Sequence, residues 1–282
     1  MKRLFLAGCA LLILFSCEKQ LTEEEENSEE TQATLIVNVT KIEQMTFAAL
    51  RAPASDVCTR LNFVVYDTDR HRVKQVNQEV GDDHFGTAYF QLPEGDYQVV
   101  VVAHSSGGNP TMTDPTKIQF KNAQGFTDTF LYSHEVTQTD QQQVLDVSLN
   151  RIVSLCRFVI TDDYPEQVAK MRFHYTGGSG AFNAYTGLGS VNSKQEMTFQ
   201  VADGQKAFDL YTFLHDTEGT IHLTVTALDA QDLEVDEREY DIPLTRNLIT
   251  KVSAPYFDTT PQGMSIDIQI NTDWDGEIEI NF

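Results

Sequence analysis

Basic residues are scarce in this chain of 282 residues. Its 20 lysines and arginines are outnumbered by 42 aspartates and glutamates, which gives a net charge of −22 at pH 7. A surface this negative repels nucleic acid and anionic lipid, because both are polyanions. The composition therefore argues against a nucleic-acid partner and against electrostatic attachment to a membrane, and it permits a solvated body outside the cell.

Cysteine is also rare, with four in the whole chain. Cys9 and Cys17 lie in the N-terminal segment, so only Cys58 and Cys156 remain for a folded body. Two cysteines are not a disulfide framework, although they can pair in an oxidising compartment. Two separate buried thiols are the favoured interpretation, and the disulfide stays open.

The common catalytic and metal-binding motifs are missing. There is no HExxH, GxSxG, phosphate loop or CxxC. His215 and His222 lie in neighbouring predicted strands but have no third ligand close in sequence. Asp67, Asp69 and the pair at 82–83 lack the glycine and terminal glutamate of a calcium loop. We therefore predict that the protein is not an enzyme and has no cofactor and no metal site.

A short apolar run follows Lys2 and Arg3 at the N-terminus. Residues 4–15 have the length of a signal-peptide core and are too few to span a bilayer as a helix. The run ends in LFSC, which resembles the lipobox of bacterial lipoproteins. This predicts a signal peptide over residues 1–16 and acyl chains such as palmitate on Cys17, enough for stable anchoring. A secretory leader with a chance cysteine is the alternative.

An acidic segment follows the predicted lipid site. Residues 23–30 contain six glutamates, and the stretch 17–33 has almost no apolar content. Such a segment buries too little surface to fold, and its like charges keep it extended. We interpret it as a tether. It also resembles the signal that directs lipoproteins of gut-type Bacteroidota to the outer leaflet.

Alternation of apolar and polar residues dominates the rest of the chain and predicts an all-β fold. TLIVNVT places Leu35, Val37 and Val39 on one face, and residues 99–102 predict a strand buried on both faces. VLDVSLNRIVSLCRFVI is long enough for two strands end to end. The predicted domains are therefore β-sandwiches over residues 34–150 and 151–282.

Aromatic residues offer few candidates for a binding platform. Trp274 is the only tryptophan and lies in a predicted closing hairpin at Asp275-Gly276. Tyr175, Phe182 and Tyr185 border a glycine-rich loop and are better candidates for exposed rings.

Several stretches, taken in order, resemble one family: LNFVVYD, LPEGDYQVVVVAH, LNRIVSLCRFVI, DLYTFLH and IPLTRNLITKV. Together they are similar to fimbrillin-like lipoproteins of the Bacteroidota, in particular the fimbrial anchor and minor-subunit proteins of the type V pilus. The resemblance implies two tandem transthyretin-like (immunoglobulin-like) antiparallel β-sandwich domains. It also implies a non-enzymatic cell-adhesion role at the outer membrane and in the fimbrium, with other fimbrial subunits as partners.

In that family, subunits join when a strand of one completes the sandwich of the next. The candidates for strand exchange here are Leu35, Val37 and Val39 near the N-terminus, and Ile278, Ile280 and Phe282 at the C-terminus. Arg51 is a candidate for the proteolytic cleavage that opens stalk subunits, whereas anchors keep the strand. A surface glycan-binding lipoprotein on similar sandwiches is the alternative hypothesis, and a host protein or glycan is kept as a further partner.

Overall fold

The first half of the chain forms one seven-stranded sheet. The computed structural model describes residues 33–43, 58–201, 204–258, 267–271 and 278–281. The sheet contains β1 (Ala33–Glu43), β2 (Arg60–Tyr66), β3 (Arg72–Glu79), β4 (Thr87–Leu92), β5 (Gly95–His104), β7 (Phe130–Gln138) and β8 (Gln143–Arg151), in the order β3-β2-β5-β7-β8-β1-β4.

This sheet bends between β7 and β8, where only Phe130 with Arg151 and Leu131 with Asn150 are paired. Its two parts, β3-β2-β5-β7 and β8-β1-β4, face each other across one apolar core. The alternation in the sequence explains the core. In TAYFQL, for example, Ala88, Phe90 and Leu92 are buried while the residues between them are not.

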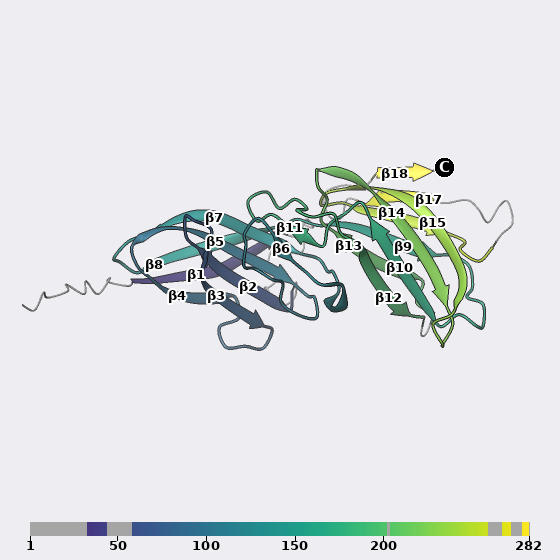
Figure 1. Cartoon of the computed structure of the whole chain (residues 1–282), viewed down its shortest axis with the longest axis horizontal. Coiled ribbons are helices and arrows are strands. Elements are labelled where there is room, and N and C mark those ends of the chain that lie inside the picture. Colours follow the sequence, from purple (N-terminus) through teal and green to yellow (C-terminus); the bar gives the residue numbers. More distant parts are fainter. Residues whose placement is uncertain (1–32, 44–57, 202–203, 259–266, 272–277, 282) are drawn as a thin grey trace, which may run out of the picture. The chain divides into compact units, whose positions relative to one another are not determined.

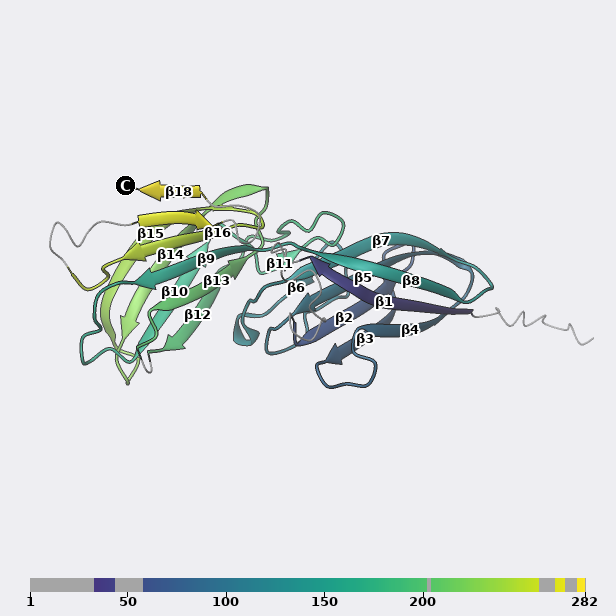
Figure 2. The same cartoon turned by 180° about the vertical axis from the view of Figure 1, so that it is seen from behind.

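Two further sheets carry the second half of the chain (Figures 1 and 2). The four-stranded sheet is β12 (Gln195–Gln200), β10 (Lys170–Thr176), β14 (Glu218–Leu228) and β15 (Glu234–Thr245). The five-stranded sheet is β13 (Ala207–Thr212), β9 (Ser154–Ile160), β16 (Ile249–Ala254), β17 (Asp267–Asn271) and β18 (Ile278–Asn281). A core rich in aromatic rings, including Phe158, Phe173 and Phe208, joins them, as in a β-sandwich.

A third apolar cluster links the two halves. It combines Val100 and Val102 of β5 with Leu155 of β9 and with Phe120 and Phe182 from long loops. These loops form the small sheet of β6 (Ile118–Gln119) and β11 (Ala181–Phe182), and a 3-10 turn at Asn122–Gln124. Because Val99 and Val101 face the first core instead, β5 is buried on both faces, as the sequence predicts.

The sequence predicts which segments are strands better than it predicts the direction in which neighbouring strands run. The described part of the chain contains no α-helix, and the all-β prediction is confirmed. The 144–160 segment forms two consecutive strands, β8 and β9, as expected. However, β1 pairs with β8 in parallel, and β16 pairs with β9 in parallel, so the prediction of purely antiparallel sheets is wrong at these two pairs. Parallel neighbours require long connections, and alternation carries no information on direction.

Within the described residues, no helix has the length and apolar character needed to cross a membrane.

Candidate assembly site

The strand β1 lies between two others and closes the second layer of the seven-stranded sheet. It pairs in parallel with β8, with Leu35 opposite Gln143, and antiparallel with β4, with Leu35 opposite Phe90. Within the described residues β1 is the only strand paired with β4. Figure 2 shows it in purple beside β8 and β4. Removing β1 would therefore leave β8 with an open edge and β4 without a partner strand.

The side chains of β1 follow the predicted alternation. Leu35 and Val37 are fully buried in the core, Val39 is half-buried, and Ile36 and Asn38 face outward. The parallel ladder shifts register between Val39 and Lys41, which marks a β-bulge.

Polar contacts fasten the outward face of β1 to both neighbours. Asn38 Nδ2 donates to Asp146 Oδ1 of β8 at 3.0 Å, and Gln91 Nε2 of β4 donates to Thr34 Oγ1 at 2.6 Å. Thr40 Oγ1 donates to the Val147 carbonyl at 3.2 Å. The strand is therefore held by apolar burial on one face, by side-chain contacts on the other and by a ladder along each edge.

The predicted cleavage and lipidation residues, Arg51 and Cys17, lie outside the described residues. The segment that contains Arg51 connects the end of β1 at Glu43 to Cys58.

At the other end of the chain, β18 forms an edge of the five-stranded sheet. It pairs antiparallel with β17, with Ile280 opposite Ile268 and Ile278 opposite Ile270. Among the described residues it has no second strand neighbour. Phe282 lies outside the described residues, as do Trp274 and the predicted turn at 275–276.

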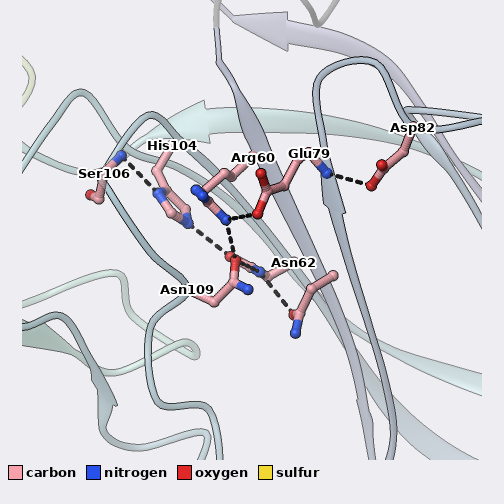
Figure 3. Close-up of polar contacts among 8 residues, drawn as sticks. Arg60, Asn62, Glu79, Asp82, His104, Ser106 and Asn109 are labelled. Atoms are coloured by element: carbon pink, nitrogen blue, oxygen red, sulfur yellow. Dashed lines mark hydrogen bonds and ion pairs between the residues drawn. The ribbon is translucent and has the colours of Figure 1, made fainter. Parts of the chain in front are cut away.

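A buried polar network lies where the chain enters β2 (Figure 3). The Ser106 backbone N–H donates to His104 Nδ1 at 3.1 Å, so the proton of the neutral ring is on Nε2. Nε2 then donates to Asn62 Oδ1 at 2.8 Å, and Asn62 Nδ2 donates to Asn109 Oδ1 at 2.9 Å. Arg60 extends the network by pairing with Glu79 of β3.

This network is structural, because its central groups are buried and satisfied. Burial lowers the pKa of His104 to about 4, and the nearby charge of Arg60 acts in the same direction. His104 therefore stays neutral at pH 7. This network contains none of the common catalytic or metal-binding motifs. The signal for it in the sequence is Asn62, a polar residue inside the otherwise apolar LNFVVY.

The other polar candidates from the sequence have local roles. His215 Nδ1 lies 3.0 Å from the Gly189 carbonyl, and His222 Nδ1 lies 2.6 Å from Asp241 Oδ1. Asp67 and Asp82 accept backbone N–H groups in turns. The described residues contain no cluster of three or more His, Cys, Asp or Glu side chains suited to a metal ion.

The predicted aromatic platform is wrong in two of its three residues. Tyr175 and Phe182 are fully buried, because they face the cores, whereas Tyr185 is 45% exposed. Cys58 and Cys156 are thiols buried in two different cores.

Comparison with sequence families identifies the group to which the chain belongs. A model described as a family of unknown function, DUF6562, matches residues 23–282. The chain belongs to this family. The comparison with curated proteins found no match to this chain.

Solved structures similar to this DUF6562 protein include a candidate adhesin from Bacteroides ovatus. It is 16% identical with a TM-score of 0.51, over 81% of this chain and 88% of that chain. A fimbrial assembly protein from Parabacteroides distasonis is 14% identical with a TM-score of 0.42, over 89% and 99% of the two chains. The fimbrial anchor protein Mfa2 from Porphyromonas gingivalis is 12% identical with a TM-score of 0.47, over 89% and 100%. The predicted resemblance to fimbrial proteins is confirmed, and at these identities the likeness is one of fold.

Proposed function

We propose that this protein is a non-enzymatic outer-membrane lipoprotein that serves as the anchor or a minor subunit of a type V fimbrium. In this proposal the body consists of two transthyretin-like sandwiches over residues 34–150 and 151–282. Acylated Cys17 attaches it to the cell surface through the acidic tether, and other fimbrial subunits bind by β-strand complementation.

The observation that carries the proposal is the position of β1. A terminal strand that lies between two others can be replaced only by a strand that supplies the same alternate apolar side chains and two ladders. Burial of Leu35 and Val37 contributes about 1.5–3 kcal/mol each, which is large against a domain stability of about 5–15 kcal/mol. An emptied groove would therefore be unstable without a replacement strand.

The anchor role is preferred over a stalk role. The lipid site and the acidic tether suit a subunit at the base of a fimbrium, and an anchor keeps β1 in its own sheet. The sequence around Arg51, LRAPAS, matches a cleavage site only loosely.

A disulfide that fixes β1 tests the role of this strand. Asn38 and Asp146 are register partners with touching side chains on the outward face, so Asn38→Cys with Asp146→Cys can join β1 to β8. Cells that lack the protein are expected to shed fimbriae into the medium. The oxidised double variant should restore attachment as well as the wild-type chain does, because an anchor keeps β1.

Two other outcomes would contradict the anchor role. Restoration only by the reduced variant would assign a stalk role. Fimbriae unaffected by loss of the protein would contradict a fimbrial role altogether. In the same cells, Cys17→Ala should move the protein from the membrane fraction to the medium, and retention in the membrane would contradict the lipid anchor.

A further inference from the structure

The first strand of each half pairs in parallel with a strand late in the same half. In the first half, β1 and β8 share eight register pairs. In the second half, β9 and β16 share six. Only Ile152 and Val153 separate the end of β8 from the start of β9, so a short covalent link joins the two parallel ladders.

Parallel pairing decides how these ladders respond to tension along the chain. In a parallel pair, the start of one strand and the end of the other lie at opposite ends of the ladder. Tension between the start of β1 and the end of β8 therefore acts along the strands, and the hydrogen bonds of the ladder carry it together. The same holds between the start of β9 and the end of β16. An antiparallel pair pulled by its two free ends, such as β17 with β18, opens one hydrogen bond after another instead.

The first ladder is braced where the chain leaves it. Arg151, the last residue of β8, makes two hydrogen bonds of 2.8 Å to Asp128, and its side chain is only 4% exposed. The Ile152 backbone N–H, one residue further on, donates to the Thr129 carbonyl at 3.0 Å. The end of β8 is therefore held by a buried ion pair as well as by the ladder.

A single carboxylate braces the chain where it leaves the second ladder. Asp162 lies just beyond the end of β9, and its Oδ1 accepts the Tyr256 backbone N–H at 2.8 Å. Its Oδ2 accepts the backbone N–H groups of Phe257 and Asp258 at 2.6 and 2.8 Å. Because these three residues follow β16, the carboxylate extends the connection between the two strands beyond their last register pair.

The ring of Tyr256 holds the same segment inside the core. Tyr256 is fully buried, and its hydroxyl donates to the Val225 carbonyl at 2.7 Å. The guanidinium carbon of Arg238 lies 5.3 Å from the centroid of the ring. Tension on the chain beyond Asp258 therefore meets the Asp162 carboxylate and a buried ring before it reaches the ladder.

We propose that the two parallel ladders, together with the Asp162 brace, are mechanical clamps that let the folded chain carry tension between its N-terminal segment and the chain beyond β16. The clamp role rests on the proposed function, because a surface anchor is pulled by its tether on one side and by a fimbrial subunit on the other. Loading of many hydrogen bonds at once slows unfolding at a given force, and this rate governs forced unfolding.

The test holds single molecules at constant force and measures the lifetime of the folded state. The full-length chain carries Cys17→Ala, so that it is not acylated, and is studied in non-ionic detergent. In one geometry, handles on peptide tags at the two termini load both ladders along the strands. In the other, the second handle is attached to an azide-bearing amino acid at position 140, an exposed residue in the turn before β8. This pulls β1 away from β8 one pair at a time, and the lifetime of the first half at equal force should be about tenfold shorter or less.

A disulfide identifies the unfolding step of the first half. Oxidised Asn38→Cys with Asp146→Cys closes the chain between these residues into a loop. When the chain is pulled by its termini, the step of the first half should lose most of its extension, whereas the step of the second half should keep its own.

Two variants of equal charge test the brace. Asp162→Asn should shorten the lifetime of the second half at constant force about tenfold, because it removes charge-assisted hydrogen bonds. The lifetime of the first half should not change. Asp163→Asn is the control, since it removes the neighbouring carboxylate, which is exposed and pairs with Lys206. It should leave both lifetimes unchanged.

Equal lifetimes of the first half in the two pulling geometries, or equal effects of the two aspartate variants, would overturn the proposal. The comparison of geometries leaves both ladders unaltered, so it decides the proposal even if Asp162→Asn does not fold. Failure of the clamps can be told apart from failure of the fimbrial role. Long lifetimes in a protein whose loss sheds no fimbriae would support the clamps and contradict the anchor, and shedding with equal lifetimes would do the reverse.

Discussion

The strands β1 and β18 have the same kind of sequence but different positions in their sheets. Both alternate apolar and polar residues, as TLIVNVT and EIEINF, and both are candidates for strand exchange. In the structure, β1 has a strand on each side, whereas β18 has one neighbour and forms an edge. Alternation reports that one face of a strand is buried. It does not show how many neighbouring strands pair with it. That number decides how strongly removal of the strand would destabilise the sheet.

The largest expected effect comes from placing a charge in β1. Val37→Asp should reduce the free energy of unfolding by more than about 4 kcal/mol, because it removes apolar burial and buries an unpaired carboxylate. Urea denaturation followed by circular dichroism measures the change. Ile36→Asp, on the outward face of the same strand, is the matched control and should cost much less.

Two results would change this interpretation of β1. Equal losses from Val37→Asp and Ile36→Asp would mean that β1 does not close the core. If Val37→Asp does not fold at all, Val37→Thr keeps the side-chain volume and should cost about 1–3 kcal/mol.

The next effect concerns the end of β8, the parallel partner of β1. Arg151 makes two hydrogen bonds of 2.8 Å to Asp128, and the arginine side chain is only 4% exposed. Asp128→Asn should cost about 3–5 kcal/mol, because it leaves a buried charge without its counter-ion.

The chain offers a close control for this ion pair. Arg157 and Asp209 have the same two-bond geometry at 2.7 and 2.8 Å, but their side chains are 41% and 33% exposed. Asp209→Asn should therefore cost less than about 1 kcal/mol. Similar losses of urea stability in the two variants would indicate that burial does not set the strength of these pairs.

A smaller effect is expected from acid at the entry to β2. Burial lowers the pKa of His104 from its usual 6.5 to about 4, so the unfolded chain binds the proton more readily. The contribution of His104 to stability is complete above pH 6.5 and is lost as the pH falls through about 4. The full loss is about 3 kcal/mol at most.

A variant isolates this histidine from the carboxylates that also titrate in acid. His104→Gln should flatten the decline of stability between pH 6.5 and 4, as measured by urea denaturation at each pH. His222→Gln, at an exposed position on β14, is the control variant for loss of a histidine. An unchanged decline in His104→Gln would mean that protonation of His104 does not destabilise the folded chain.

The sequence predicted strands better than it predicted their neighbours. Alternation located β1, β8 and β9 and the buried face of each, because burial of one face requires period two. It could not give the parallel pairing of β1 with β8, since strand direction depends on contacts between residues 107 or 108 positions apart.

The candidate sites show the same limit. Asn62 and His104 are 42 positions apart and meet only through strand pairing. By contrast, Tyr175 and Phe182 were predicted exposed from a glycine-rich neighbourhood, although aromatic rings of this size are usually buried. Local composition identified the loop but did not indicate which of its side chains are buried in the core.

The smallest expected effect comes from the edge strand itself. Deleting residues 278–282 removes one four-pair ladder and leaves β17 as the new edge. The backbone groups freed on β17 can bond to water, so the loss in the free energy of unfolding should be below about 2 kcal/mol. Urea denaturation of the full-length and shortened chains, with Val37→Asp measured beside them, gives the comparison directly. A loss as large as that of Val37→Asp would contradict the view of β18 as an edge strand and would place it in a core. A small loss, together with unchanged circular dichroism, would leave β18 available for pairing without cost to the fold, whereas β1 can leave only if another strand replaces it.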